Sequence, residues 1–238
     1  MEATWLRRQV QETVDRLLAG RDSIKVLEAG CGSILFLRFP EPAHVTGVDI
    51  SKKQLDRNPR LHERIVGDLQ TCELPREAFD VVVCWNVLEH LPQPELAVTR
   101  LAAALGPGGV LVLACPNPRS LRALATRLTP LWFHVWFYKS VLGYKAAGED
   151  DVGPFPTIMS RSIAPEALCQ LAQSCGLEVE LKLLAKGNWW WSKSSIARRA
   201  VEGTVDGVGR ALRLLTMGRY DGDLAQTRLV FRKTVIRP

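Results

Sequence analysis

The amino-acid sequence predicts an α/β fold: a seven-stranded, mostly parallel sheet with helices on both faces and two insertions in its C-terminal half. Two observations predict this fold. Short apolar runs typical of buried strands alternate with segments whose apolar residues recur at helical spacing, which is the pattern of βαβ units. The alternation is lost at residues 116–162 and 185–226, so we expect these segments to be insertions around a regular core.

The length of 238 residues predicts one domain spanning 1–238. Hydrophobic residues make up 47% of the chain, which allows a packed core and excludes a disordered protein. No apolar run approaches the roughly 18 residues of a membrane-spanning helix, and the N-terminal segment lacks the apolar core of a secretory signal. The six cysteines show neither C-x-x-C pairs nor zinc-ligand spacing. Together these features predict a cytoplasmic protein with reduced thiols.

The regular elements are expected in a definite order along the chain. An amphipathic helix from about residue 3 to 19 precedes the first strand, because its apolar residues recur at helical spacing. Further helices are expected at 95–105 and 165–175, with a glycine-rich turn at 106–109. The strands are expected at residues 24–27, 44–48, 64–66, 79–85, 110–115, 177–184 and 227–235.

A glycine pair follows the first strand. Gly30 and Gly32 allow a sharp backbone turn and a close approach to a ligand, because neither has a Cβ. The N-terminus of a following helix would offer free N–H groups. A G-x-G pair alone is a weak indication, since a tight turn after a buried strand needs the same residues. Glu28, at the end of the strand, adds a carboxylate that can accept a hydrogen bond from an ammonium group.

Two further acids follow the next two strands. Asp49 lies 19 residues after Gly30, at the position from which an acid binds ribose hydroxyls in nucleotide-binding α/β proteins. Asp68, after the third strand, can accept a hydrogen bond from an exocyclic amine such as that of adenine. Together with Glu28 these acids converge on the crevice at the carboxyl ends of the strands, where open α/β sheets bind ligands.

Five ordered segments resemble the motifs of class I S-adenosylmethionine-dependent methyltransferases, which have a Rossmann-like fold. They read VLEAGCGS at residues 26–33, GVDIS at 47–51, GDL at 67–69, FDVVVCWNVLEHL at 79–91 and LGPGG at 105–109. The order and spacing of all five motifs make the resemblance specific. It is loose at 165–184 and 227–235 and absent from the two insertions.

The resemblance implies S-adenosylmethionine as the cofactor and gives roles to the matching residues. The residues implied to line its methionine moiety are Glu28, Gly30, Gly32 and Asn86. Those implied to hold the ribose and the adenine are Asp49, Ile50, Asp68 and Leu69. Ile34 stands where the family usually has a further glycine, so we expect a loop of different shape. The third glycine of the dinucleotide fingerprint would fall at Leu35, which argues against NAD.

His90 and His134 are the candidate general bases. Methyl transfer needs the acceptor and the methyl carbon held in line, and a hydroxyl acceptor also gains from a base with a pKa near neutral. His90 follows the fourth strand on the expected acceptor side, and His134 lies among aromatic residues of the first insertion. A capping or packing role explains His90 as well as catalysis does, and packing is the favoured interpretation of His134.

Residues 86–90, which read NVLEH, also resemble a segment of quinone-pathway O-methyltransferases. There, carboxylates and a histidine can bind a divalent cation. Asn86 replaces one of the expected carboxylates, so no metal site is predicted. Natural-product, quinone and lipid-linked acceptors all stay open.

The insertion at 116–162 is predicted to be a lid. It follows the fifth strand, beside the expected mouth of the site, where it can close over the acceptor and exclude water. Its aromatic residues favour a hydrophobic acceptor. The alternative is a helical subdomain that only covers the sheet. The insertion at 185–226, before the last strand, is basic and aromatic and begins with three tryptophans at 189–191.

The net charge of +6 is concentrated near the C-terminus, because residues 186–238 carry +7 and residues 1–185 carry −1. Within 189–215, arginines interleave an apolar stripe, a pattern typical of a helix on a membrane surface. Packing against the sheet or a second subunit explains the stripe equally well, so peripheral membrane contact and an oligomer both stay open. A nucleic-acid partner is not expected, since no RNA-binding module is recognisable.

The sequence as a whole predicts S-adenosylmethionine-dependent methyl transfer to a small, hydrophobic acceptor at a hydroxyl oxygen. Two other classes stay open. A nucleic-acid methyltransferase is suggested by the basic C-terminal region and would show salt-sensitive nucleic-acid binding. A non-catalytic cofactor- or membrane-binding protein with the same fold would bind the cofactor without turnover.

Overall fold

The computed structural model describes residues 2–140, 143–149, 153–186, 207–211, 213–218, 220, 222 and 224–235. The strands are β1 (Ile24–Ala29), β2 (Ala43–Asp49), β3 (Glu63–Val66), β4 (Phe79–Trp85), β5 (Leu105–Pro116), β6 (Leu177–Ala185) and β7 (Gln226–Lys233). The helices are α1 (Glu2–Leu18), α2 (Lys52–Asp56), α3 (Pro94–Ala104), α4 (Leu121–Leu128), α5 (Leu131–Ser140) and α6 (Pro165–Ser174). Two short 3₁₀ helices are η1 (Leu88–His90) and η2 (Arg161–Ile163).

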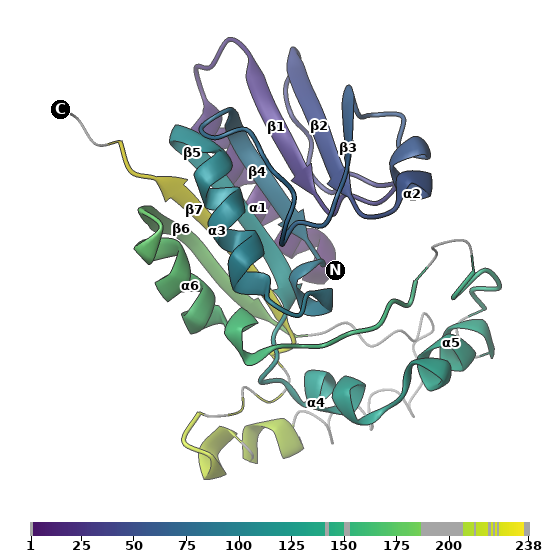
Figure 1. The fold of residues 1–238 in the computed structure, drawn as a ribbon. Coiled ribbons are helices and arrows are strands. Elements are labelled where there is room, and N and C mark those ends of the chain that lie inside the picture. The colour runs from purple at the N-terminus through teal and green to yellow at the C-terminus, as the bar shows by residue number, and fades with distance from the viewer. Residues whose placement is uncertain are drawn as a thin grey trace.

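The strands form one seven-stranded sheet in the order β3-β2-β1-β4-β5-β7-β6 (Figure 1). The pairs from β3 to β5 are all parallel, whereas β7 is antiparallel to both β5 and β6. The predicted mostly parallel, Rossmann-like sheet is therefore confirmed.

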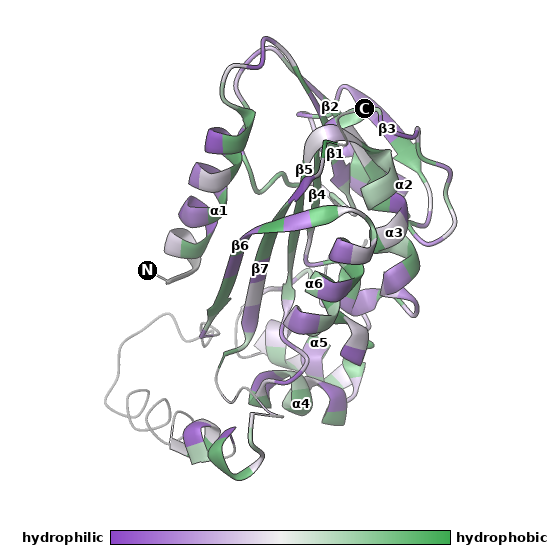
Figure 2. Ribbon diagram, turned by 90° about the vertical axis from the view of Figure 1, so that its left-hand side faces the viewer, coloured by the Kyte–Doolittle hydropathy of each residue, from purple (hydrophilic) through white to green (hydrophobic). Residues whose placement is uncertain are grey.

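Helices cover both faces of this sheet, as predicted. On one face, α1 packs across β5, β6 and β7, and its residues Leu6, Val10 and Val14 are buried because they recur along one side of the helix. On the other face lie α3 and α6, which also contact each other (Figure 2). The core accordingly forms two buried apolar clusters, one on each side of the sheet.

The glycine-rich segment 106–109 differs from its prediction. It was expected as a turn but lies within β5, because Leu105 already pairs with Phe79 of β4. The register of the two strands then shifts between Phe79 and Val81, which accommodates the extra residues.

The first insertion, 116–162, contains α4, α5 and η2. In Figure 1, α4 and α5 lie near the edge of the sheet at which β1, β2, β3 and β4 end. Its role as a lid stays a prediction. Among the described residues, no helix is long and apolar enough to cross a membrane.

Most of the second insertion, 185–226, lies outside the described residues, and this includes the three tryptophans at 189–191. Most of the basic and apolar stripe at 189–215 lies outside them as well. The membrane contact and the oligomer inferred from that stripe therefore stay predictions.

Candidate active site

The loops after β1, β2 and β4 begin at the same level of the sheet. Ala29 of β1 pairs with Val48 of β2 on one side and with Cys84 of β4 on the other. Because these strands are parallel, the residues that follow them share the carboxyl edge of the sheet, where such folds bind ligands. We refer to this region as the carboxyl edge.

The two glycines after β1 are required for different reasons. Both have positive φ angles, 66° at Gly30 and 50° at Gly32, which favour glycine. A Cβ on Gly30 would lie 2.4 Å from Cγ2 of Val87, so this glycine allows the loop to pack against the chain after β4. A Cβ on Gly32 would meet only Gln54, at 3.8 Å, so the surface above Gly32 is open for a ligand.

Asp49 links the glycine loop to the start of α2. Its Oδ2 accepts a hydrogen bond from the Gly32 N–H at 2.8 Å, and its Oδ1 accepts one from the Ser51 N–H at 2.8 Å. Each carboxylate oxygen has a further lone pair, so Asp49 can also accept from two ribose hydroxyls. The neighbouring Ile50 is 74% exposed, as expected of a side chain that would lie against an adenine ring.

The predicted adenine-edge residues differ in their surroundings. Asp68 Oδ1 accepts a hydrogen bond from the Gln70 N–H at 2.8 Å. Leu69 is only 4% exposed and packs in the apolar core, so a contact with adenine would have to use its backbone. Both assignments stay predictions.

Asn86 follows β4 with a φ of 56°, in the left-handed region that non-glycine residues rarely adopt. Its N–H donates to the carbonyl of Ala114 on β5 at 2.7 Å, and the residue is exposed. Backbone conformations of this kind concentrate at functional sites, and asparagine tolerates this one better than most residues. The position suits the predicted role of Asn86 below the methionine moiety.

Glu28 is buried beside the glycine loop, with 2% of its surface exposed, and its Oε1 has no hydrogen-bond partner. Burial raises the pKa of this carboxyl to about 8, while the charge of Arg60 lowers it. A buried polar atom without a partner costs about 1–3 kcal/mol, so a bound ammonium group would relieve it. The open surface above Gly32, the lone pairs of Asp49 and this oxygen together fit S-adenosylmethionine.

His90, at the end of η1, is held in one tautomer. Its Nδ1 lies 2.6 Å from the carbonyl oxygen of Pro156, which can only accept, so Nδ1 carries the hydrogen. The Nε2 atom then keeps its lone pair and can act as a base. Burial lowers the pKa of His90, although the bond to Pro156 raises it, so the ring is neutral near pH 7.

Two more hydrogen bonds fasten the first insertion next to His90. The N–H groups of Ile158 and Met159 donate to the Glu89 carbonyl at 2.9 and 3.0 Å. The Phe155 ring meets the His90 ring edge-on, with 5.9 Å between the ring centres. The segment that returns from α5 therefore lies against the candidate base.

His134 has a different environment. Its Nε2 lies 2.9 Å from Oγ1 of Thr129 and 3.2 Å from the Thr129 carbonyl. The Thr129 hydroxyl donates to the Ala125 carbonyl at 2.8 Å, so the hydrogen between histidine and threonine belongs to His134. This contact stabilises the turn between α4 and α5 and leaves the lone pair on Nδ1 of His134, so His134 stays an alternative to His90 as the base.

Three residues were not singled out from the sequence, namely Glu89, Thr227 and Arg228. Within the described part of the chain, the buried side-chain polar atoms without a partner belong to Glu28, Asn58, Glu89, Thr227 and Arg228. The β5–β7 register places Thr227 opposite Cys115 and Arg228 opposite Ala114, at the end of β5. The sequence signal for Arg228 was a charge directly before the apolar residues Leu229, Val230 and Phe231, since a charged residue is rarely buried without a partner.

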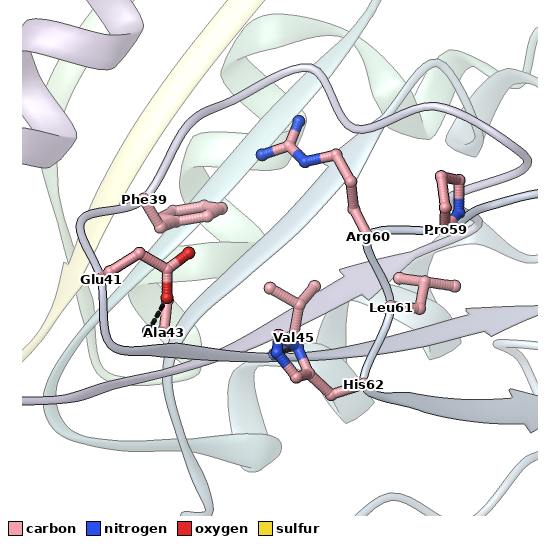
Figure 3. Close-up of a pocket in the computed structure, with 8 residues that line it drawn as sticks. All are labelled: Phe39, Glu41, Ala43, Val45, Pro59, Arg60, Leu61 and His62. Atoms are coloured by element: carbon pink, nitrogen blue, oxygen red, sulfur yellow. Dashed lines mark hydrogen bonds between the residues drawn. The ribbon is translucent and has the colours of Figure 1, made fainter.

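A pocket of about 240 Å³ lies elsewhere, at the amino-terminal end of β2 (Figure 3). Its lining includes Phe39, Val45, Arg60 and Leu61, and none of the predicted site residues. We therefore place the site at the carboxyl edge rather than in this pocket. No group of three His, Cys, Asp or Glu side chains that could hold a metal occurs among the described residues.

Comparisons with known proteins identify the family of the chain. A family model described as a methyltransferase domain matches residues 3–182. A ubiquinone biosynthesis O-methyltransferase of Psychrobacter cryohalolentis is 35% identical over 125 residues, which cover 46% of this chain and 47% of that protein. A protein of the same name from Azoarcus sp. is 32% identical over 173 residues, which cover 68% of this chain and 66% of that protein. The chain spans about half the length of most of these curated relatives.

Among solved structures, a putative sarcosine dimethylglycine methyltransferase from Galdieria sulphuraria has a TM-score of 0.57 at 16% identity, covering 97% of this chain and 84% of that one. At this identity the likeness shows the fold alone. The match of the family model to most of the chain shows the family as well as the fold. The chain belongs to the methyltransferase domain family, which together with the fold implies S-adenosylmethionine as the cofactor.

Proposed function

We propose that the protein transfers a methyl group from S-adenosylmethionine to a hydroxyl oxygen of a small, hydrophobic, quinone-like acceptor. The observation that carries this proposal is the fixed tautomer of His90, which leaves Nε2 as a neutral base at the carboxyl edge. Relatives named as ubiquinone biosynthesis O-methyltransferases support a hydroxyl acceptor of this kind.

The residues of the glycine loop and its neighbours would hold the cofactor, which supplies an electrophilic methyl group on a sulfonium. Asp49 would accept from the ribose hydroxyls while it keeps the loop in place through Gly32. Glu28 would lose its proton and accept from the ammonium group, because a nearby positive charge favours the ionised carboxyl. Rigid placement of these contacts is what an in-line displacement requires.

His90 would remove the proton of the acceptor hydroxyl. Its Nε2 would take that proton as the oxygen attacks, and the Pro156 carbonyl would stabilise the resulting imidazolium through Nδ1–H. The adjacent Phe155 and Ile158 are 45% and 46% exposed, so the segment beside His90 presents apolar surface. That surface suits a hydrophobic acceptor and helps to exclude water.

The test is a methyl-transfer assay with a panel of acceptors. The purified chain is incubated with methyl-labelled S-adenosylmethionine and catechols, hydroquinones, amines and RNA, and products are identified by mass spectrometry. We expect label on the oxygen of a phenolic acceptor. Label on nitrogen, carbon or RNA contradicts the proposal. Tight cofactor binding with no product would favour a non-catalytic binding protein.

A further inference from the structure

The helices of the first insertion expose large apolar side chains. Leu124 and Leu128 lie one turn apart on α4, and Leu128 is 76% exposed. Trp132 and Trp136 lie one turn apart on α5 and are 70% and 51% exposed. Residues four positions apart share one side of a helix, so each of these helices has an apolar side that is largely open to solvent.

The second insertion exposes apolar side chains at the same end of the molecule. Leu214 and Leu215 are each 80% exposed. Residues 207–218 lie at the same end as α4 in both views (Figures 1 and 2). The two insertions are joined there, because the Leu121 N–H donates to the Gly222 carbonyl at 2.8 Å. Two segments distant in sequence therefore expose apolar area side by side at the carboxyl edge.

The charges among these side chains have one sign. Residues 116–148 contain five Lys or Arg and no Asp or Glu, and residues 207–218 contain two arginines and no acid. Arg127, Lys145 and Arg213 are exposed. Exposed tryptophan and leucine with cations between them are typical of protein surfaces that lie at the boundary between the head groups and the acyl chains of a bilayer.

Other partners match only part of this surface. A second copy of the chain in a symmetric interface would bring its cations against the same cations, which is unfavourable. Nucleic acid offers phosphates to the cations, but its bases stack on aromatic rings and leave Leu128 and Leu214 without a partner. An anionic bilayer matches both components, because its head groups attract the cations and its acyl region takes up the apolar side chains.

We propose that the exposed apolar sides of α4 and α5, together with residues 207–218, dock on the surface of an anionic lipid bilayer. The inference goes beyond the proposed function, since docking needs neither cofactor nor acceptor. Both insertions leave the sheet at the carboxyl edge, so docking brings this edge close to the bilayer. Hydrophobic molecules concentrate in the bilayer, because their transfer out of water is favourable.

The experiment measures binding of the purified chain to lipid vesicles by co-sedimentation. One set of vesicles contains equal parts of phosphatidylglycerol and phosphatidylcholine, and the other contains phosphatidylcholine alone. We expect at least about fivefold tighter binding to the anionic vesicles, since each cation close to such a surface contributes about this factor. High salt should reduce this preference, because it screens the attraction.

Two double variants separate the apolar and the charged components. Leu128→Ala with Trp132→Ala should weaken binding to anionic vesicles at least about tenfold, because less apolar area enters the bilayer. Arg127→Gln with Lys145→Gln should reduce the preference for anionic vesicles at least about fivefold. All four side chains are exposed, so the melting temperature should stay that of the wild type.

Matched controls lie at the opposite edge of the sheet. Val179 near the start of β6 and Val235 after the end of β7 are exposed apolar residues at that edge. Arg76 is an exposed cation in the segment that leads into β4. Val179→Ala with Val235→Ala, and Arg76→Gln, should leave binding to both sets of vesicles unchanged.

Several results would overturn the proposal. Equal binding to the two sets of vesicles, no binding to the anionic set, or undiminished binding by the Leu128→Ala and Trp132→Ala double variant each does so. A lipid-free dimer in sedimentation velocity that this double variant dissociates would assign the surface to a second copy of the chain. Binding to RNA without binding to vesicles would assign it to nucleic acid.

Discussion

At the scale of single residues, Asp49 combines two roles that one substitution removes together. It binds the backbone of Gly32 and Ser51, and its remaining lone pairs are available to a ribose. Asp49→Ala should weaken S-adenosylhomocysteine binding at least about tenfold, because charge-assisted hydrogen bonds contribute about 1.5–3 kcal/mol each. Calorimetry measures this loss of affinity directly.

Asp56→Ala is the control for this variant, since Asp56 is an exposed acid in the neighbouring α2. Wild-type affinity in Asp49→Ala would exclude the ribose assignment.

Glu89 should make stability depend on pH. Its pKa is about 8 in the folded protein, against an ordinary value of 4.5. Below pH 4.5 Glu89 is protonated in both the folded and the unfolded protein, and its contribution to the free energy of unfolding is fully present. As the pH rises toward 8, the unfolded chain ionises first, so this contribution is progressively lost. At about 1.4 kcal/mol per pKa unit, the loss is on the order of a few kcal/mol.

Glu89→Gln should abolish this dependence, so the variant gains stability relative to wild type between about pH 5 and pH 8. The groups around Glu89 are Arg228, which stays charged, and Cys84 and Cys115, whose pKa values are raised by burial so that both stay thiols. Urea denaturation at both pH values provides the measurement. Parallel pH profiles for the two proteins would show that Glu89 is ionised throughout.

At the scale of elements, the loop after β1 and the chain after β4 depend on each other through Gly30 and Val87. Gly30→Ala adds a methyl group 2.4 Å from a Val87 methyl and an unfavourable positive φ. The expected loss is about 1–3 kcal/mol of unfolding free energy. In the double variant with Val87→Ala, the part of the stability loss that comes from the clash with Val87 should be recovered. The part that comes from the positive φ at position 30 should remain. Denaturation curves for the four proteins test this, and strictly additive effects would contradict it.

The strands could be predicted from the sequence because buried parallel strands read as short apolar runs between turn residues. The same rule could not predict α5. Its sequence LWFHVWFYKS is apolar at nearly every position, and none of its residues is buried, so no polar side marks a helical period. The prediction of a turn at 106–109 was wrong for a related reason. Glycine and proline indicate a turn locally, whereas the pairing of Leu105 with Phe79 is a tertiary contact.

The convergence of three acids at the carboxyl edge was predictable from the sequence, and the surroundings of Arg228 were not. Glu28, Asp49 and Asp68 each follow a strand, so their convergence depends only on the parallel order of the sheet. Glu89 and Arg228 are distant in sequence and become neighbours only because β7 inserts antiparallel beside β5. A single sequence holds no sign of that pairing.

At the scale of the whole molecule, the sheet topology directs both insertions to one edge. The strands β5 and β6 are both antiparallel to β7, so they end at the same side of the sheet. Pro116 at the end of β5 and Ala185 at the end of β6 both pair with Gln226. Each insertion therefore leaves the sheet at the edge where β1, β2 and β4 also end.

We propose that His90 assists methyl transfer at the carboxyl edge. The most direct measurement is the pH dependence of kcat for wild type, His90→Ala and His134→Ala, with an acceptor identified in the panel. We predict that His90→Ala loses about 10²–10⁴ in turnover and keeps its cofactor affinity and melting temperature. The wild-type profile should fall at low pH, below the ordinary range of a histidine, because burial lowers the pKa of His90. Unchanged turnover in His90→Ala, with a collapse in His134→Ala, would contradict the role of His90 and assign the base to the first insertion.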